Sequence, residues 1–353
     1  MMKKLALLLL IISFHLQAQI PAGYYDNAQG LSGYQLKTAL KNIITNSHNP
    51  HSYSDLYTCY QTSDTDNYYE NDGTVLDMYS EKPNGPDAYE YHHISDKCGN
   101  YSGEGSCYNR EHLVPQSVFG SAAPMKSDAH FVVPADGYVN NRRSNYPFGE
   151  VSNPTWTSTN GSKLGHNSTS GYNGIVFEPI DEFKGDIARM LFYFATRYED
   201  QVAGWDHDML NHTSNQVFSN WFLNILLQWH YNDPVSQREI DRNNAVYNFQ
   251  GNRNPYIDHP EWVAQIWDPT NATPNNKTNK WIIYPNPIRD HVLHIKNQDQ
   301  DILEIDILDL SGKKIQIVQK NFKNIHLPLE LQGMYILLIK SQENTSVKKI
   351  IVE

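Results

Sequence analysis

Residues 181–198, DEFKGDIARMLFYFATRY, carry apolar side chains on one side at helical spacing, which is typical of a helix in a protein core. The same spacing recurs at 34–44 (YQLKTALKNII) and at 216–230 (QVFSNWFLNILLQWH). Residues 236–246 (SQREIDRNNAV), just after Pro234, suggest a further helix. We expect Lys184, Arg189 and Arg197 of the first segment to form a solvated or salt-bridged face. These segments together predict a mainly helical domain.

Between the helix predicted at 34–44 and the later helices, residues 96–174 are dense in Gly, Ser, Asn and Pro and are expected to be loop-rich. Long irregular stretches are uncommon in a compact domain unless they serve a site. Upstream, residues 74–79 (TVLDMY) alternate loosely and predict a short strand. Asp64 and Asp66 could bind Ca²⁺, but a turn is favoured because no spaced loop of ligands follows them.

The pattern of apolar residues changes after residue 267. Residues 268–280 (DPTNATPNNKTNK) have no apolar periodicity and are typical of a linker. Short alternating segments then follow, separated by turn signals such as Ser311-Gly312 and Gln332-Gly333, which predicts a small β-sandwich. The expected fold class is α+β, with a mainly helical, loop-rich domain at 20–267 and an all-β sandwich at 281–353, a division that suits a length of 353 residues.

The N-terminus has the order of features found in a secretory signal peptide. Lys3 and Lys4 precede an apolar run from Leu5 to Phe14, and the small residue Ala18 follows. The run is too short to span about 30 Å of hydrocarbon, so we expect residues 1–19 to be removed rather than to form an anchor. No later segment approaches spanning length, so the mature chain is expected to be soluble, with no integral membrane segment, and secreted or displayed on the surface.

Export permits disulfide bonds. The chain has three cysteines, Cys59, Cys98 and Cys107, which allow one bridge and leave one thiol. Cys98 and Cys107 enclose a short Gly-rich loop and are the favoured pair, although the sequence leaves the connectivity open. The spacing of the three does not resemble a zinc site.

The formal net charge is −11, and removal of Lys3 and Lys4 takes it two units lower, to −13. A protein this acidic has no global attraction to a phosphate backbone, which argues against simple nucleic-acid binding. An enzyme is less constrained, because a metal ion and a few local arginines can hold one phosphate.

Glu111 and His112 are the first candidate catalytic pair. A carboxylate can bind a hard cation such as Mg²⁺, and a neutral imidazole can act as a general base near neutral pH. On a strand the two side chains would point to opposite faces, so the backbone must bend to aim both at one phosphate. About 28 residues later, residues 135–145 can form a short helix on which Asn140 and Arg143 share a face. By itself a Glu-His dipeptide is common, and most such pairs are surface charge beside a satisfied histidine.

Three longer motifs support a catalytic role for Glu111 and His112. Residues 109–117 (NREHLVPQS), 125–134 (MKSDAHFVVP) and 139–149 (VNNRRSNYPFG) together resemble the bacterial endonuclease I family. The resemblance continues through 184–189 (KGDIAR), Trp229-His230, 233–235 (DPV) and 252–261 (NRNPYIDHPE), and it covers roughly residues 36–267. Its members are secreted or periplasmic non-specific nucleases with a ββα-metal (His-Me finger) active site, so the resemblance implies that motif here.

Carried over position by position, the resemblance makes His112 the general base. It makes Glu111 and Asn140 the ligands of one Mg²⁺, or of another hard divalent cation such as Mn²⁺ or Ca²⁺. Arg143 becomes a candidate for catalysis and, with Arg142, for phosphate binding; a structural salt bridge is an equally good interpretation of Arg143. Asn109 and Arg110 are interpreted as context.

Asp128 and His130 match a D-x-H element of the family, which implies a supporting role at the site, with a packing role as the alternative. One departure from the family pattern concerns an inserted segment, present in some relatives, whose arginine contacts the scissile phosphate. Here only residues 116–127 intervene, without arginine, so another residue must take that role or it is missing.

The C-terminal part, from 284–287 (YPNP) through 333–335 (GMY) to the final IIVE, resembles a type IX secretion sorting domain. A carbohydrate- or partner-binding sandwich is the alternative. The implied partners are thus the type IX secretion machinery and a nucleic-acid substrate. The predicted function is a secreted metal-dependent endonuclease that cuts DNA, and RNA as an open possibility, with little sequence preference. A phosphodiesterase for small substrates and an inactive surface-binding homologue are the alternatives.

Overall fold

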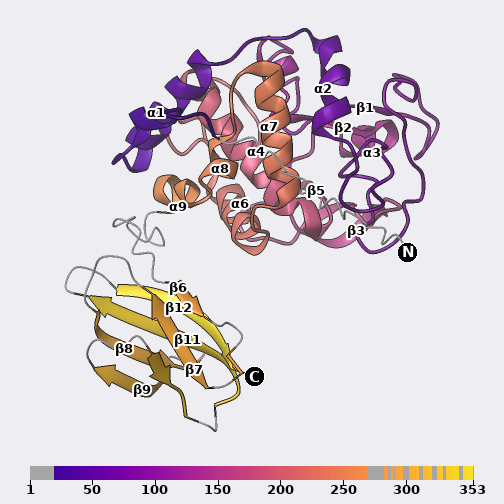
Figure 1. The fold of residues 1–353 in the computed structure, drawn as a ribbon. Helices are drawn as coiled ribbons and strands as arrows, with labels where there is room; N and C mark the ends of the chain where they lie inside the picture. The colour runs from indigo at the N-terminus through magenta and orange to yellow at the C-terminus, as the bar shows by residue number, and fades with distance from the viewer. Residues whose placement is uncertain are drawn as a thin grey trace, which may run out of the picture. The chain divides into compact units, whose positions relative to one another are not determined.

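The computed structural model describes residues 20–268 and, in the C-terminal part, residues 282–284, 288–289, 291–296, 302–309, 313–319, 324–328, 331–341 and 345–352. The chain divides into two compact units, residues 1–272 and 273–353 (Figure 1). The expected signal peptide and linker lie outside the described residues. No helix among the described residues is long and apolar enough to cross a membrane.

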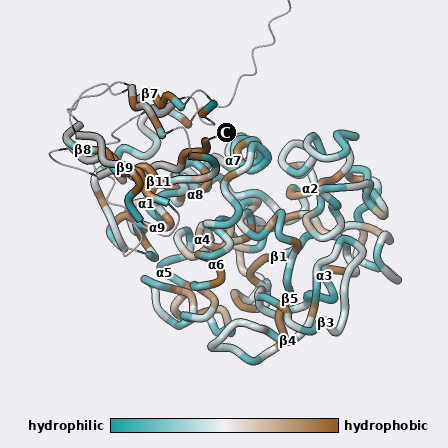
Figure 2. Tube along the Cα trace, turned by 90° about the horizontal axis from the view of Figure 1, so that it is seen from below, coloured by the Kyte–Doolittle hydropathy of each residue, from teal (hydrophilic) through white to brown (hydrophobic). Residues whose placement is uncertain are grey.

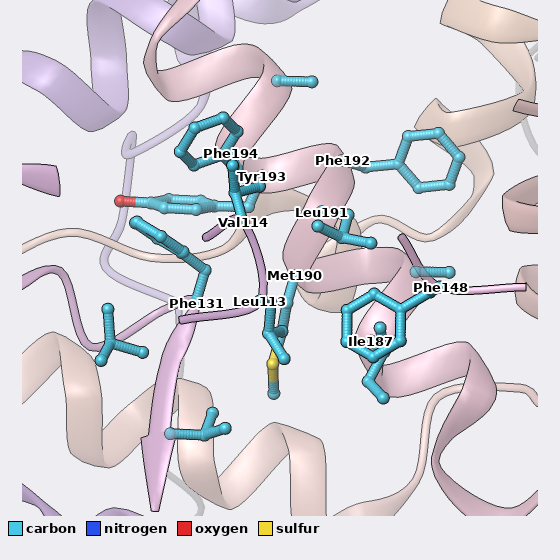
Figure 3. Packing of buried hydrophobic residues seen from close by; sticks show 14 of the residues in the cluster. Leu113, Val114, Phe131, Phe148, Ile187, Met190, Leu191, Phe192, Tyr193 and Phe194 are labelled. Carbon is cyan, nitrogen blue, oxygen red and sulfur yellow. The ribbon is translucent and has the colours of Figure 1, made fainter. Parts of the chain in front are cut away.

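Helix α4 (Lys184–Arg197) is the centre of the N-terminal unit, and all of its residues are buried. It packs against α1 (Gly33–Asn46) and α6 (Asn220–Asn232). Figure 3 shows its apolar side chains Ile187, Leu191 and Phe194 gathered beside Leu113 and Phe131, which come from the β1 and β2 region. Residues next to β1 and β2 therefore pack against α4. In Figure 2, hydrophilic residues follow most of the outer turns, and apolar segments lie inside near β1 and α6.

The helices predicted from the sequence are present. The helix predicted at 34–44 is α1, the one at 181–198 is the short 3₁₀ helix η4 (Asp181–Phe183) followed by α4, and the one at 236–246 is α7 (Gln237–Gln250). The helix predicted from 216 begins only at residue 220, because Phe218 forms a β-bridge with Leu210 and Ser219 caps α6. Further short helices are α2 (Leu56–Ser63), α5 (Glu199–Val202), α8 (Pro255–Asp258), α9 (Glu261–Trp267), η1 (Asp26–Ala28), η2 (Tyr53–Asp55) and η3 (Met125–Ser127).

The segment at 96–174 is more ordered than the sequence predicted. It holds β1 (Tyr108–His112), β2 (Val132–Asp136), α3 (Gly137–Arg143), β3 (Val151–Thr157) and β4 (Lys163–Asn167). Strands β1 and β2 pair antiparallel, while β3, β4 and β5 (Ile175–Glu178) form a second antiparallel sheet in that order. The strand predicted at 74–79 is wrong: only Val75 forms a bridge, with Thr65, and the chain then turns at Asp77.

The charged residues of α4 are buried, not solvated. The Arg189 guanidinium is 0% exposed and donates to both carboxylate oxygens of Glu239, at 2.5 and 2.8 Å, and to Asp186 at 3.2 Å. Arg238 pairs with the same Asp186. The salt-bridged interpretation is confirmed for Lys184 and Arg189, and the Arg189 network joins α4 to α7, whereas Arg197 donates to the Thr45 hydroxyl at 3.1 Å.

In the C-terminal unit, two antiparallel sheets enclose one small core, as expected for a sandwich. Their strand orders are β10-β7-β6 and β12-β11-β8-β9. Leu293 and Ile325 from the first sheet share a buried cluster with Ile305, Leu337 and Ile350 from the second. The strands are β6 (Ile282–Tyr284), β7 (Val292–Lys296), β8 (Ile302–Leu308), β9 (Lys314–Gln319), β10 (Asn324–His326), β11 (Gly333–Ser341) and β12 (Thr345–Val352).

The buried network makes a direct prediction about stability. Arg189→Met leaves the Glu239 and Asp186 carboxylates buried with too little positive charge, so the free energy of unfolding should fall by about 3–5 kcal/mol. The exposed pair Lys41–Asp200, 2.8 Å apart, provides the control, since Lys41→Met should cost under about 1 kcal/mol. Urea unfolding followed by circular dichroism measures both. Equal losses in the two variants would show that the network does not hold α4 to α7.

Candidate active site

Strands β1 and β2 and helix α3 form one continuous local unit. Glu111 lies opposite Val133 and His112 lies opposite Val132 in the antiparallel pair. Helix α3 begins directly after β2, where the Asp136 carboxylate caps it by accepting the Val139 N–H at 2.7 Å. The helix returns across β1, which brings residues 140 and 143 to residues 109–113. Two sequence segments some 28 residues apart therefore meet at one place.

The place where they meet is an open pocket of about 600 Å³. Glu111, His112, Asn140 and Arg143 all line it, although Glu111 and His112 are neighbours on a strand. The other lining residues are Tyr53, Tyr57, Lys97, Cys98, Gly99, Tyr101, Asn109, Arg110, Pro115, Gln116, Asn141, Ser144 and Asn145.

Glu111 is a buried carboxylate, only 2% exposed. Its Oε1 accepts a hydrogen bond from the Tyr79 hydroxyl at 2.9 Å and lies 3.2 Å from a terminal nitrogen of Arg143. Burial raises the pKa of Glu111 to about 7, against the opposing effect of the Arg143 charge. A carboxylate in this state is stabilised by further positive charge.

His112 has one tautomer compatible with its surroundings. Its Nε2 lies 3.1 Å from the carbonyl oxygen of Lys126. Because a carbonyl oxygen only accepts, Nε2 must carry the hydrogen, and Nδ1 keeps the lone pair. Burial lowers the pKa of His112 to about 4, and the nearby cations Arg110, Lys126 and Arg143 act in the same direction. The imidazole is therefore neutral, and able to accept a proton, at neutral pH.

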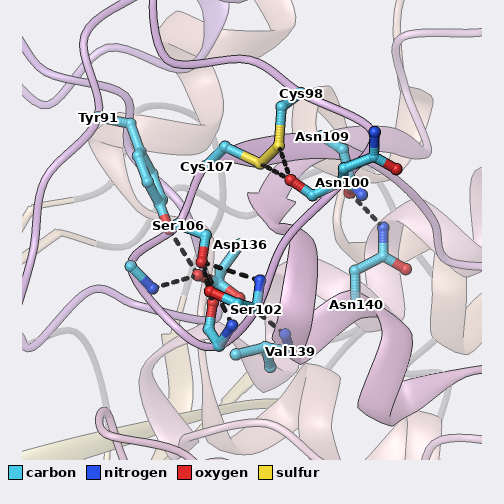
Figure 4. The surroundings of a disulfide bond; sticks show 12 residues. Tyr91, Cys98, Asn100, Ser102, Ser106, Cys107, Asn109, Asp136, Val139 and Asn140 are labelled. Atoms are coloured by element: carbon cyan, nitrogen blue, oxygen red, sulfur yellow. Dashed lines mark hydrogen bonds between the residues drawn. A yellow bond between two sulfur atoms is a disulfide. The ribbon is translucent and has the colours of Figure 1, made fainter.

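The Asn140 amide is oriented by its own donors. Its Nδ2 donates to the Asn109 side-chain oxygen at 2.6 Å and to the Arg110 carbonyl at 3.3 Å (Figure 4). Since the Arg110 carbonyl only accepts, the atom that faces it must be the amide nitrogen. Oδ1 of Asn140 is thereby left as an acceptor.

Arg143 is held entirely within the protein. It is 1% exposed and donates to the carbonyl oxygens of His112 and Leu113 at 2.9 and 2.7 Å, in addition to its ion pair with Glu111. These contacts favour the structural interpretation of this residue over phosphate binding. Arg142 does not line the pocket; its guanidinium lies 5.2 Å from the Trp156 ring.

Arg110 is better placed to meet a phosphate than the sequence suggested. Its guanidinium lies 3.4 Å from the centre of the Tyr53 ring and 4.4 Å from that of Tyr57, and one terminal nitrogen donates to the Tyr53 carbonyl at 2.8 Å. Lys97 lies 4.9 Å from the Tyr57 ring centre. Both cations line the pocket. Only the closeness of Arg110 to Glu111 in sequence could have indicated it, and nothing pointed to Lys97.

Asp128 and His130 lie outside the pocket lining and tie neighbouring elements together. The Asp128 carboxylate, 0% exposed, accepts from the hydroxyls of Tyr193 and Tyr198 at 2.9 and 2.8 Å and from the Gln250 amide at 2.7 Å. His130 bonds to the Asn252 carbonyl at 3.0 Å. These contacts fix the start of β2 against α4 and α7, which is the packing role.

Tyr79 was missed by sequence analysis, because its segment resembled a strand. Asp77 fixes the turn that presents it: this carboxylate accepts the Tyr79 N–H at 2.8 Å and the Asp136 N–H at 2.6 Å. The same Asp77 thus links the tyrosine that contacts Glu111 to the residue that caps α3.

A disulfide between Cys98 and Cys107 closes the loop at the edge of the pocket, and Cys59 is buried as a free thiol (Figure 4). The loop is tied to the catalytic unit through Asp136, which accepts from the Gly105 N–H at 2.8 Å and the Tyr91 hydroxyl at 2.5 Å. The wall that carries Cys98 and Lys97 is therefore fixed relative to α3.

Comparisons with known proteins identify the families that match each part of the chain. The endonuclease I family matches residues 32–261, and the secretion system C-terminal sorting domain matches residues 282–353. Extracellular ribonucleases of Bacillus amyloliquefaciens and Bacillus subtilis (strain 168) are 37% and 34% identical over 248 residues, which are 69% of the chain and 78% of each relative. Endonuclease-1 of Buchnera aphidicola subsp. Acyrthosiphon pisum (strain APS) is 27% identical over 134 residues, 38% of the chain and 45% of the relative.

The family match covers the whole candidate site, from the 3₁₀ helix at Tyr53–Asp55 to α8. The sorting domain and the extracellular relatives support a secreted or cell-surface location. The chain therefore belongs to the endonuclease I family, is a hydrolase of phosphodiester bonds, and ends in a secretion-system sorting domain.

Proposed function

We propose that the protein is a secreted, divalent-metal-dependent endonuclease that cuts DNA and RNA by activating water with His112. The observation that carries this proposal is the convergence of a neutral histidine with a free Nδ1, a buried carboxylate and an amide oxygen on one open pocket. Little sequence preference is proposed on the resemblance to the endonuclease I family. Action on RNA is proposed because the two Bacillus relatives are named ribonucleases.

The order β1, β2, α3 supports assignment to the ββα-metal class of active sites. In this assignment β1 supplies both Glu111 and His112, β2 pairs with β1, and the helix supplies Asn140. The donor set fits a hard divalent cation, because it consists of a carboxylate and an amide oxygen without sulfur. The raised pKa of Glu111 is a second sign of fit, since a cation would compensate the buried negative charge.

A Mg²⁺, or another hard divalent cation, bound by Glu111 and Asn140 would stabilise negative charge on the phosphate and the leaving oxygen. The chain's own groups do the rest. Nδ1 of His112 accepts the proton of the attacking water, while the Nε2–H bond to the Lys126 carbonyl stabilises the imidazolium that forms. Arg143 acts as a positioning residue, because its bonds to the His112 and Leu113 carbonyls fix the end of β1.

Arg110 and Lys97 are proposed to hold the phosphate. The Tyr53 and Tyr57 rings restrict the Arg110 guanidinium, which lowers the cost of ordering it on the substrate. In some relatives an arginine of an inserted segment contacts the scissile phosphate, and residues 116–127 contain no arginine. Arg110 would take over that contact here. The arrangement also explains how a chain with a net charge of −11 can act on a polyanion, since the attraction is local to the pocket.

The general-base assignment predicts the effect of removing the imidazole. His112→Ala should lower kcat by about 10²–10⁴-fold, because the proton acceptor is lost and the Glu111 carboxylate is assigned to the cation. Nicking of supercoiled plasmid and degradation of total RNA, each with Mg²⁺ and with EDTA, measure the loss. The exposed His166 gives a matched control, His166→Ala, which should retain full activity.

Two results would contradict this assignment. Cleavage that survives both EDTA and His112→Ala would exclude the mechanism. Turnover of bis(p-nitrophenyl) phosphate without cleavage of either polynucleotide would favour a phosphodiesterase for small substrates, and no turnover at all would favour an inactive binding homologue.

The raised pKa of Glu111 predicts how metal dependence changes with pH. Below about pH 7 the carboxylate binds a proton that must leave before a cation binds, so the Mg²⁺ concentration giving half-maximal activity should rise about tenfold per pH unit. Above pH 7 it should level off. Activity measured against Mg²⁺ concentration from pH 5 to 8.5 checks this. A half-maximal concentration that does not change between pH 5.5 and 7 would show that Glu111 is not the ligand.

The phosphate assignment separates Arg110 from Arg142. Arg110→Ala should lower kcat/KM by about 10–100-fold, because a charge-assisted bond to phosphate is lost, whereas Arg142→Ala should change it less than about threefold. Steady-state cleavage of a fluorescent oligonucleotide at two salt concentrations measures both. The reverse order of effects would return the phosphate role to Arg142.

A further inference from the structure

A second group of acidic side chains lies outside the catalytic pocket. Asp66, Glu70 and Glu81 each offer a carboxylate oxygen, and these oxygens all lie within 4.8 Å of one another. None of the three residues lines the pocket. Asp66 and Glu81 are buried, and Glu70 is half-buried.

Asp66 fixes the loop that brings these groups together. Its Oδ1 accepts the backbone N–H groups of Tyr68 and Tyr69, and its Oδ2 accepts those of Glu70 and Asn71, all at 3.0 Å. This is the turn favoured by the sequence. The turn also sets the position of Glu70, which follows it closely along the chain.

Glu81 is the member of the group that points to a ligand. It is 2% exposed, and its Oε1 is buried without any hydrogen-bond partner. Burial, together with the neighbouring carboxylates of Asp87, Glu70 and Asp66, raises the pKa of Glu81 to about 9. Among the described residues, no lysine or arginine forms a salt bridge with Glu81 or Glu70. A buried carboxylate in this position needs a proton or a cation to offset its desolvation.

We propose that Asp66, Glu70 and Glu81 form a Ca²⁺ site separate from the catalytic centre. The ligands are oxygen only, which disfavours zinc and copper. The three oxygens lie within 4.8 Å of one another, close enough to share one ion, and protein carboxylates suit Ca²⁺, whose coordination is flexible, better than Mg²⁺, which usually keeps several waters. Extracellular modules bind Ca²⁺ with dissociation constants of about 10⁻⁴–10⁻³ M, and the relatives and the sorting domain place this chain outside the cell.

The position of the site gives it a consequence for catalysis. Glu81 lies two residues after Tyr79, whose hydroxyl contacts Glu111, and the Glu81 N–H donates to the Asp77 carbonyl at 2.9 Å. A cation shared by Glu81 and the loop of Asp66 would join the two ends of residues 66–81. The bound ion therefore stabilises the segment that presents Tyr79 to the active site, without contacting the substrate.

The test must separate this site from the catalytic metal, so it uses the full chain carrying Glu111→Gln, which removes the proposed catalytic ligand. Ca²⁺ binding is measured by isothermal titration calorimetry and the melting temperature is recorded in Ca²⁺, Mg²⁺ and EDTA. The comparison adds Glu81→Gln or, as the matched control, Glu90→Gln, an exposed carboxylate close to Asp87.

We expect the Glu111→Gln protein to bind Ca²⁺ and to melt at a higher temperature in Ca²⁺ than in Mg²⁺ or EDTA. Adding Glu81→Gln should raise the Ca²⁺ dissociation constant at least about tenfold and abolish the calcium-dependent rise, whereas Glu90→Gln should leave both unchanged. In EDTA the Glu81→Gln protein should melt no lower than its parent, because the buried Oε1 has no hydrogen-bond partner to lose, and this result would show that the variant is folded. Unchanged Ca²⁺ binding after Glu81→Gln, or a parent protein that does not respond to Ca²⁺, would overturn the proposal.

Discussion

The Arg143 guanidinium joins α3 to the end of β1, and the active-site geometry depends on that contact. It donates to the carbonyls of His112 and Leu113 and pairs with Glu111, so one buried cation sets both the course of the backbone and the charge beside the carboxylate. An arginine suits this role because its fixed fork of donors can bond several acceptors at once. The contact also accounts for the way adjacent strand residues come to serve one pocket.

The N-terminal unit contains several buried carboxylates, and the role of each depends on whether a cationic side chain lies beside it. The Glu239 carboxylate has Arg189, and Asp64 has Arg242 at 2.8 Å, so these pairs hold helices together. Glu111 has only part of its charge balanced, which leaves it suited to a cation. Glu81 has no such partner, and this difference is the basis for a second metal site.

Much of the fold follows from periodicity in the sequence. The predicted helices at 34–44 and 181–198 bury apolar side chains, whereas α7, predicted at 236–246, buries mainly polar and charged residues; alternation correctly indicated the C-terminal strands. The strands within 96–174 were not predicted, because short strands rich in polar and Pro residues gain their pairing from tertiary contacts instead of local pattern. The strand predicted at 74–79 is wrong for the opposite reason: its side chains alternate in the sequence, but the backbone turns at Asp77.

Only part of the candidate site could be predicted from the sequence. Glu111, His112 and Asn140 were found through motifs, and the structure brings them to one pocket. Arg110, Lys97 and Tyr79 were not found, because their relevance depends on loops that meet only in the folded chain. The burial of Arg143 likewise arises only in the folded chain. The sequence alone therefore could not decide whether Arg143 binds phosphate or is a structural cation.

The protonation state of His112 is the point on which the functional account rests most directly. Nitrogen-15 NMR of histidine-labelled protein, assigned with His112→Ala, measures both the tautomer and the titration of this ring. We predict a neutral ring with hydrogen on Nε2 and a bare Nδ1, titrating near pH 4 because burial lowers the pKa of His112. A hydrogen on Nδ1, or a charged ring at pH 6, would contradict the assignment of His112 as the general base.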